Sequence, residues 1–154
     1  MNTLEAVRYK QRPDNLFKQI SAFSENIELQ SQWARYLCVL TSGFLETSIC
    51  AIYNRLAGQS ASPYVANFVK SQLGGFQNPK MGKILELTGA FNPQWANELE
   101  TATEGELKDA VDSIVANKNH IAHGRDVGIT YTRIKNYYEE AIKVVDLIEK
   151  MCGI

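Results

Sequence analysis

Both histidines of this sequence lie in one short polar stretch, Asn117-Lys118-Asn119-His120-Ile121-Ala122-His123-Gly124. The apolar residues before it recur every three or four positions, which predicts an amphipathic helix that closes within the stretch. Gly124 is the residue type that favours the left-handed conformation just past a helix end. We therefore expect both imidazoles to lie where a helix opens into a loop, an end at which the helix dipole favours cationic groups.

The spacing of three side chains in this stretch predicts that they converge. At about 100° per residue, Lys118 continues the apolar face of the helix, so it points toward the interior of a bundle. Asn119 and His123 are four residues apart and share a face. An ammonium, an amide and an imidazole in one small volume can bind a phosphate and move a proton, because histidine titrates near neutral pH. Without further information, such a cluster is more often a solvated set of helix-dipole partners, so both interpretations stay open here.

Composition limits the classes of protein to consider. The 154 residues are expected to form one domain over 1–154, in which residues 1–12 fray or form a short helix. A net charge of −1 disfavours a protein that coats nucleic acid, so any such contact should be confined to one cleft. No apolar run looks long enough to span a bilayer, and no signal-peptide pattern is evident. The three cysteines fall in apolar helical contexts and indicate reduced thiols in a cytoplasmic protein.

Helical periodicity runs along the sequence, and no segment alternates like a strand over a useful length. A first helix is expected to start at Pro13-Asp14, with a break over residues 24–26. The long helix expected over residues 27–57 is apolar almost all round in its second half, so it should be central. The last helix is expected over 131–151. These features predict an all-α bundle with a long antiparallel pair at its core and short helical insertions between residues 60 and 100.

Helix starts are also marked locally. Ser62 before Pro63 and Thr130 before the last helix are candidate N-caps, because their hydroxyls can accept from the first free backbone N–H groups. Asn78-Pro79 is expected to restart a helix after the Gly74-Gly75 break.

The apolar half of the long helix carries a single charge, Glu46, between residues 36 and 54. A carboxylate in such a position is costly unless it is paired. One interpretation is a structural ion pair with Arg125 or Arg133. The other places Glu46 beside Lys118 and His123, where it would set their charge or orientation. The sequence alone does not separate the two.

The pattern Lys118-Asn119-x-x-Ala122-His123-Gly124 resembles the signature of the HEPN superfamily. That signature is an arginine followed after four to six residues by a histidine, often Arg-Asn-x-x-Ala-His-Gly. The similarity is to the RiboL-PSP branch, which has counterparts of Gly43-Phe44-Leu45-Glu46-Thr47-Ser48 in the long helix and of residues 124–131 after the histidine. It runs from about residue 30 to the C-terminus. One position departs from the pattern, because the family's arginine is Lys118 here, which keeps the charge but lacks the planar fork.

This resemblance implies a HEPN-like helical bundle that pairs as a homodimer, bringing two copies of the motif into one cleft. It also implies a metal-independent endoribonuclease that needs no cofactor. By this analogy His123 activates or protonates an oxygen at the scissile phosphate of RNA, and Lys118 stabilises the developing negative charge. Asn119 orients the histidine or binds phosphate. Glu46, Arg125 and His120 are the expected supporting residues.

Two functions follow from the resemblance and remain open at this point. In the first, the protein cleaves RNA in a toxin–antitoxin, phage-defence or RNA-processing role, with a cognate antitoxin or another protein as partner and no membrane involved. In the second, Lys118 marks a domain that has lost cleavage and acts as an RNA-binding, dimerisation or scaffolding module. A metal site is not predicted, because the two histidines lack the third protein ligand that a catalytic zinc usually needs.

Overall fold

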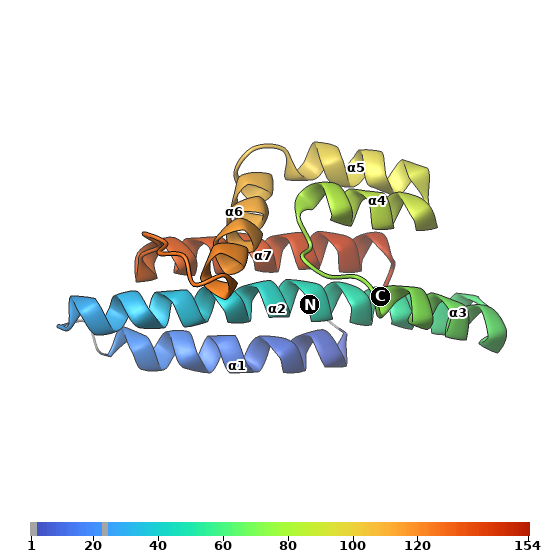
Figure 1. Ribbon diagram of the computed structural model, residues 1–154. Helices are drawn as coiled ribbons and strands as arrows, with labels where there is room; N and C mark the ends of the chain where they lie inside the picture. The colour runs from blue at the N-terminus through green and yellow to red at the C-terminus, as the bar shows by residue number, and fades with distance from the viewer. Residues whose placement is uncertain (1–2, 23–24) are drawn as a thin grey trace.

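The computed structural model describes residues 3–22 and 25–154, and these residues form seven helices and no strand (Figure 1). In chain order the helices are α1 (Leu4–Ser21), α2 (Ile27–Ser60), α3 (Pro63–Leu73), α4 (Met81–Phe91), α5 (Pro93–Thr103), α6 (Glu106–Ala122) and α7 (Tyr131–Met151). Their buried hydrophobic side chains form one cluster, to which α2 and α7 contribute most of the residues. The predicted all-α bundle, with short helices inserted between residues 60 and 100, is confirmed.

The helix α2 is central to the fold, as its composition predicted. It starts where the side chain of Asn26 accepts a hydrogen bond from the backbone N–H of Leu29 at 3.0 Å, and it extends to Ser60, slightly beyond the prediction. By length and composition alone, α2 could also span a membrane, so the expectation that no run was long enough is wrong. In its most apolar window, 61% of the residues are buried inside the bundle, as in the core helix of a soluble protein.

The long central pair consists of α2 and α7, but these helices run parallel, whereas the sequence predicted an antiparallel pair (Figure 1). Both are antiparallel to α1. Near the end of α1, Phe17 stacks on Tyr138 with ring centroids 4.8 Å apart and also contacts Tyr131 at the start of α7. At the other end, the backbone N–H of Thr3 donates to the carboxylate of Glu149. A short loop forces consecutive helices to be antiparallel, but four helices separate α2 from α7, so their relative direction depends on packing.

The helix α1 begins at Leu4 and runs through Pro13, so the predicted start at Pro13-Asp14 is wrong. Residues 1–12 were expected to fray or to form a short helix, and from Leu4 onward they belong to the long helix α1. Residues 1–2, and residue 24 of the predicted break, lie outside the described residues. A proline within a helix removes one backbone donor and disfavours the turn before it. Pro13 is buried, and the hydroxyl of Tyr138 donates to Asp14 Oδ1 at 2.8 Å on the adjoining turn. Packing of α1 against α2 and α7 therefore outweighs the local preference.

The predicted N-caps are confirmed at two helices. Ser62 Oγ accepts from the backbone N–H of Val65 at 3.5 Å, and Thr130 Oγ1 accepts from that of Arg133 at 3.2 Å. The start of α4 differs from the prediction, because the helix begins at Met81 and not at Asn78-Pro79.

The N-cap residue of α4, Lys80, makes no side-chain capping hydrogen bond. Its acceptor comes from another helix instead, since Asp112 Oδ1 on α6 accepts from the backbone N–H of Met81 at 2.8 Å. This contact ties the loop of residues 74–80 to α6.

All three cysteines are free, as expected. Burial raises the pKa of the Cys38 thiol to about 12, and it raises the pKa of Cys50 and of Cys152 to about 11. The Cys38 thiol also lies 3.5 Å from the carbonyl oxygen of Ile114, so it forms part of the contact between α2 and α6. A raised pKa lowers the fraction of thiolate, which is the reactive form of a cysteine.

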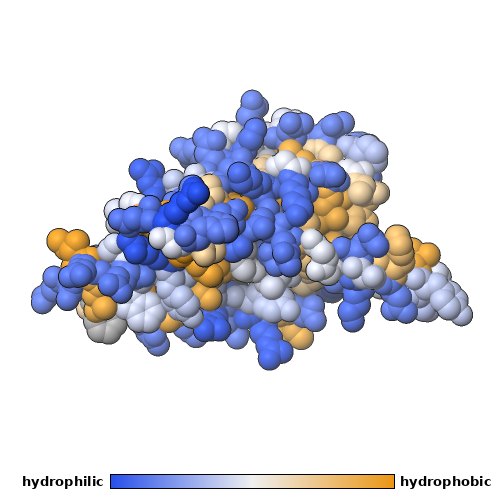
Figure 2. Space-filling view, in the orientation of Figure 1, coloured by the Kyte–Doolittle hydropathy of each residue, from blue (hydrophilic) through white to orange (hydrophobic). Residues whose placement is uncertain are grey.

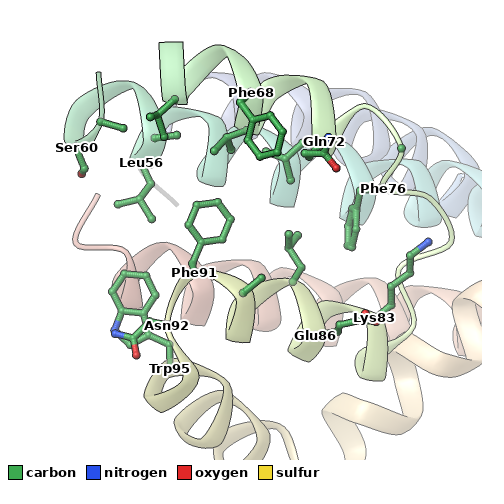
Figure 3. A pocket seen from close by; sticks show the side chains of 18 residues that line it. Leu56, Ser60, Phe68, Gln72, Phe76, Lys83, Glu86, Phe91, Asn92 and Trp95 are labelled. Atoms are coloured by element: carbon green, nitrogen blue, oxygen red, sulfur yellow. The ribbon is translucent and has the colours of Figure 1, made fainter. Parts of the chain in front are cut away.

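The two ends of the bundle have different surfaces. A cavity of about 910 Å³ opens between α3 and α4, and its lining is largely apolar, with Phe68, Phe76 and Phe91 pointing into it (Figure 3). Figure 2 shows hydrophobic side chains over this region and mainly hydrophilic ones around the loop that follows α6. None of the site residues predicted from the sequence lines this cavity.

Candidate active site

The end of α6 is closed by a pair of backbone hydrogen bonds that place His123 as its C-cap residue. The N–H of Gly124 donates to the carbonyl of Ile121 at 3.0 Å, and the N–H of Arg125 donates to that of His120 at 2.9 Å. Gly124 has φ 68°, the left-handed conformation that this Schellman arrangement requires. The predicted glycine stop is therefore confirmed, and the imidazole of His123 is exposed where the helix opens into the loop.

One turn earlier, the side chain of Lys118 is held by a chain of hydrogen bonds that reaches α2. Lys118 Nζ donates to Asn78 Oδ1 at 2.8 Å, and the backbone N–H of Asn78 donates to Glu46 Oε2 at 3.2 Å. All three residues are partly buried. We call these three residues the Lys118–Asn78–Glu46 chain. It crosses from α6 through the loop of residues 74–80 to the middle of α2.

Glu46 makes neither of the ion pairs that the first interpretation proposed. Among the described residues, it forms no salt bridge with Arg125 or Arg133, and the guanidinium of Arg133 lies instead over the ring of Tyr137, 5.9 Å from its centroid. Glu46 does lie close to Lys118, as in the second interpretation, but the link passes through Asn78. No hydrogen bond in the described part of the chain joins Glu46 to His123.

Sequence reasoning missed Asn78 as a member of this site. Two local signals were present: an asparagine before a proline often marks a turn, and asparagine tolerates the left-handed region better than most residues. Asn78 has φ 53°. Neither signal names a partner, because Lys118 is 40 residues away in the sequence.

The other predicted site residues surround the helix end without direct side-chain links. Asn119 is partly buried, and its backbone carbonyl accepts from the N–H of His123 at 3.1 Å. His120 and Arg125 are exposed. Between residues 25 and 154, no hydrogen bond joins the side chains of Lys118, Asn119 and His123, so their convergence on one ligand stays a prediction. No group of three or more His, Cys, Asp or Glu side chains with a metal-binding arrangement occurs in the described residues.

A second contact from α2 that the sequence did not predict restrains the loop after His123. Arg35 Nη2 of α2 pairs with Asp126 Oδ1, which lies three residues beyond the histidine. Asp126 is 87% exposed, so this surface pair contributes at most about 1 kcal/mol. Two residues of α2 therefore hold the segments before and after the end of α6. Glu46 is linked to Lys118 through Asn78, and Arg35 pairs directly with Asp126.

Comparison with known proteins identifies a family for this chain. The family model described as RiboL-PSP-HEPN matches residues 8–153 of the 154. The match begins in α1, so it extends further toward the N-terminus than the resemblance from about residue 30 that the motifs indicated. No curated protein and no solved structure matches the chain in the same comparisons. Because the family model covers almost the whole length of the sequence, the chain belongs to the RiboL-PSP-HEPN family.

Proposed function

We propose that this protein is a metal-independent endoribonuclease that cleaves RNA at the end of α6. The observation that carries the proposal is the set of partners that the Lys118 ammonium has in the structure. Among the described residues, the only hydrogen-bond partner of its ammonium is the neutral amide of Asn78, and no carboxylate forms an ion pair with it. A cation that is held in place without an ion-pair partner, on the same helix end as an exposed imidazole, is suited to bind a phosphodiester. HEPN domains are often ribonucleases, which supports this choice.

The reaction that fits these groups is an internal transesterification of RNA. The 2′-hydroxyl attacks the adjacent phosphorus, the new P–O2′ bond forms, and the P–O5′ bond breaks. His123 takes the proton from the 2′-hydroxyl or gives one to the departing 5′-oxygen, as a general base or acid. The ammonium of Lys118 stabilises the extra negative charge on the phosphorane. The products are a 2′,3′-cyclic phosphate and a 5′-hydroxyl, with no water consumed.

A homodimer is part of the proposal. Of the two histidines at this helix end, the family signature matches only His123, so each chain supplies one motif imidazole, whereas the reaction needs one group to accept a proton and another to donate one. Two copies of the end of α6 in one cleft would supply both, and HEPN domains are often dimeric. The exposed side chains of His120 and Arg125 would then face the partner chain or the RNA backbone.

The test is the cleavage of a mixed-sequence RNA in EDTA, comparing the wild-type protein with His123→Ala. We expect cleavage by the wild type alone, with cyclic phosphate on the 3′ ends of the products. An active preparation that keeps its rate as His123→Ala would show that the site is wrongly assigned. Loss of activity in EDTA, restored by a divalent cation, would exclude the metal-independent mechanism.

A binding module that has lost cleavage is the second candidate function. It is favoured by the lysine at position 118, where the family signature has arginine, and by the lack of a hydrogen bond between the side chains of Lys118 and His123 within the described residues. In this case the wild-type protein would bind single-stranded RNA and leave it intact, and Lys118→Arg would be equally inactive. Cleavage that appears or rises in Lys118→Arg would instead indicate a weakened nuclease.

A further inference from the structure

A pocket of about 530 Å³ lies between α1 and the first half of α2, away from the motif residues. On the α1 side it is lined by Arg8 and Arg12, which are four residues apart and therefore share a face of the helix. On the α2 side it is lined by the aromatic residues Trp33 and Tyr36. Here we call it the α1–α2 pocket.

The aromatic side of the pocket has a defined geometry. The rings of Trp33 and Tyr36 meet edge to face, with centroids 5.7 Å apart and an interplanar angle of 69°. Arg12 Nη2 donates to the hydroxyl of Tyr36 at 2.8 Å, so one arginine is aligned against the aromatic pair. Tyr36 is 38% exposed and Trp33 is partly buried, so both rings retain surface that a flat ligand can contact. Arg8 is exposed and makes no hydrogen bond within the described residues.

The remaining polar side chains of the pocket are amides, from Gln11, Asn15 and Gln19 of α1. None of the described residues that line it is a carboxylate, so no side chain of the lining competes with a phosphate for the two guanidinium groups. Guanidinium groups, aromatic rings and amides are together the groups that recognise an unpaired nucleotide. The arginines bind its phosphate, the rings stack on its base, and the amides pair with the edge of the base.

The α1–α2 pocket and the motif are joined through one turn of α2. Tyr36 lines the pocket, while its neighbour Arg35 pairs with Asp126 in the loop that follows His123. In Figure 1, the end of α1, the start of α2 and the loop between α6 and α7 lie at the same end of the bundle. The pairing with Arg35 also offsets the negative charge of Asp126, which would otherwise oppose RNA between the two sites.

We propose that the α1–α2 pocket binds an unpaired nucleotide of the same RNA strand that is cleaved at His123, on one side of the scissile bond. This inference rests on the proposed function and specifies its substrate as single-stranded RNA. The low net charge of the chain agrees with local contacts of this kind, because a protein with a net charge of −1 does not attract RNA over its whole surface.

The experiment uses the fluorescence of Trp33. The sequence has two tryptophans, and the other, Trp95, lines the separate cavity between α3 and α4. In a Trp95→Phe protein, Trp33 is therefore the sole tryptophan. A short single-stranded 2′-O-methyl RNA, which lacks the attacking hydroxyl, is titrated while its binding is followed separately by the anisotropy of an end label. We expect Trp33 emission to be quenched in parallel with binding, and a duplex of the same sequence to quench it much less.

Arginine variants test the phosphate contact. Because Arg8 has no partner within the described residues, Arg8→Gln should leave the melting temperature unchanged while weakening RNA binding about tenfold and lowering its salt dependence. Arg55→Gln and Lys70→Gln are matched controls, since both residues line a different pocket that also contains Glu5, and neither should change RNA binding. Trp33→Phe should retain part of the stacking affinity that Trp33→Leu loses.

The outcomes separate this inference from the proposed function. RNA binding that depends on Lys118 but leaves Trp33 emission unchanged would overturn the α1–α2 pocket as a nucleotide site and leave the nuclease proposal intact. No change in anisotropy with the wild-type protein would overturn both. Titration with 5′-AMP gives a third measurement, because quenching of Trp33 by the free nucleotide supports the pocket even when the protein cleaves no RNA.

Discussion

The two halves of the motif differ in how firmly the fold holds them. Lys118 is partly buried and connected to α2 by the Lys118–Asn78–Glu46 chain, with hydrogen bonds of 2.8 Å and 3.2 Å. Five residues further on, His123 is exposed, and its imidazole makes no hydrogen bond or ion pair within the described residues. The cation is thus positioned by the protein itself, whereas the imidazole is oriented only by the helix end that carries it.

This difference indicates which part of the site is complete in a single chain. The ammonium of Lys118 is held in place without an ion-pair partner, so it is suited to bind a phosphate before any chemistry occurs. An exposed imidazole instead acquires its orientation from the substrate or from a second copy of the protein. The comparison therefore predicts that changes at His123 alter the reaction without altering the fold, whereas changes around Lys118 affect both.

Replacement of His123 should have the largest effect on activity. We expect His123→Ala to lower the rate of RNA cleavage by about 10²- to 10⁴-fold, the usual contribution of a general acid or base. The melting temperature should stay the same, because the side chain is exposed. His120→Ala is the matched control on the preceding turn and should retain most of the rate. If the two variants lose activity equally, the distinction between the histidines is wrong.

Replacement of Lys118 should have the second largest effect on activity. Lys118→Met keeps the length of the side chain and removes its charge, so cleavage should fall about a hundredfold, as for the loss of one donor to a developing anion. Stability should fall as well, because Asn78 loses its partner. Lys108→Met, on an exposed position of the same helix, controls for the loss of a positive charge. Unchanged stability in Lys118→Met would argue that its hydrogen bond to Asn78 contributes little.

Asn78 allows the charge at Lys118 to be changed without touching the motif. Asn78→Asp keeps an acceptor of the same shape but adds a negative charge next to the ammonium. RNA binding and cleavage should therefore fall about tenfold, while the fold is kept. Asn78→Gly retains the positive φ and removes the side chain that accepts from Lys118 without adding a charge, so activity should fall only a few-fold and the free energy of unfolding by about 1 kcal/mol. If the Asn78→Asp protein is more active than the Asn78→Gly protein, the positive charge of Lys118 does not have the role proposed for it.

Substitution of Gly124 tests whether the end of α6 positions His123. An added Cβ at Gly124 meets no atom within 4 Å, so Gly124→Ala is disfavoured only by its φ of 68°. We expect a loss of about 1 kcal/mol in the free energy of unfolding and a few-fold loss of cleavage as His123 shifts. Gly128→Ala, in the same loop with equal space and no positive φ, is the control and should be neutral. Equal effects of the two substitutions would show that the Schellman motif does not position His123.

The smallest effect is expected at Arg35. Arg35→Gln removes the surface ion pair with Asp126, so the free energy of unfolding should fall by less than about 1 kcal/mol. Chemical denaturation measures this change, and cleavage should fall only slightly. A large loss of activity with unchanged stability would mean that the loop after His123 needs this tether to bind RNA.

Much of the fold could be predicted because its signals are local. The caps at Ser62 and Thr130 and the glycine stop at Gly124 each depend on neighbouring backbone groups, and each is found in the structure. The apolar surface of α2 likewise identified it as the central helix. Where tertiary packing overrode a local preference, the predictions were wrong. Pro13 lies inside α1 because its buried surroundings favour a continuous helix, and α4 begins late because its first cap comes from Asp112.

The amino-acid sequence by itself determined the all-helical class, the central position of α2 and the placement of Lys118, Asn119 and His123 at a helix end. These follow from periodicity, composition and capping, which act over a few residues. Only the tertiary structure decided that α2 and α7 run parallel, that Asn78 joins Lys118 to Glu46, and that Arg35 holds the loop at Asp126. The physical reason is that these contacts join residues far apart in the chain, and their partners are selected by how the helices pack.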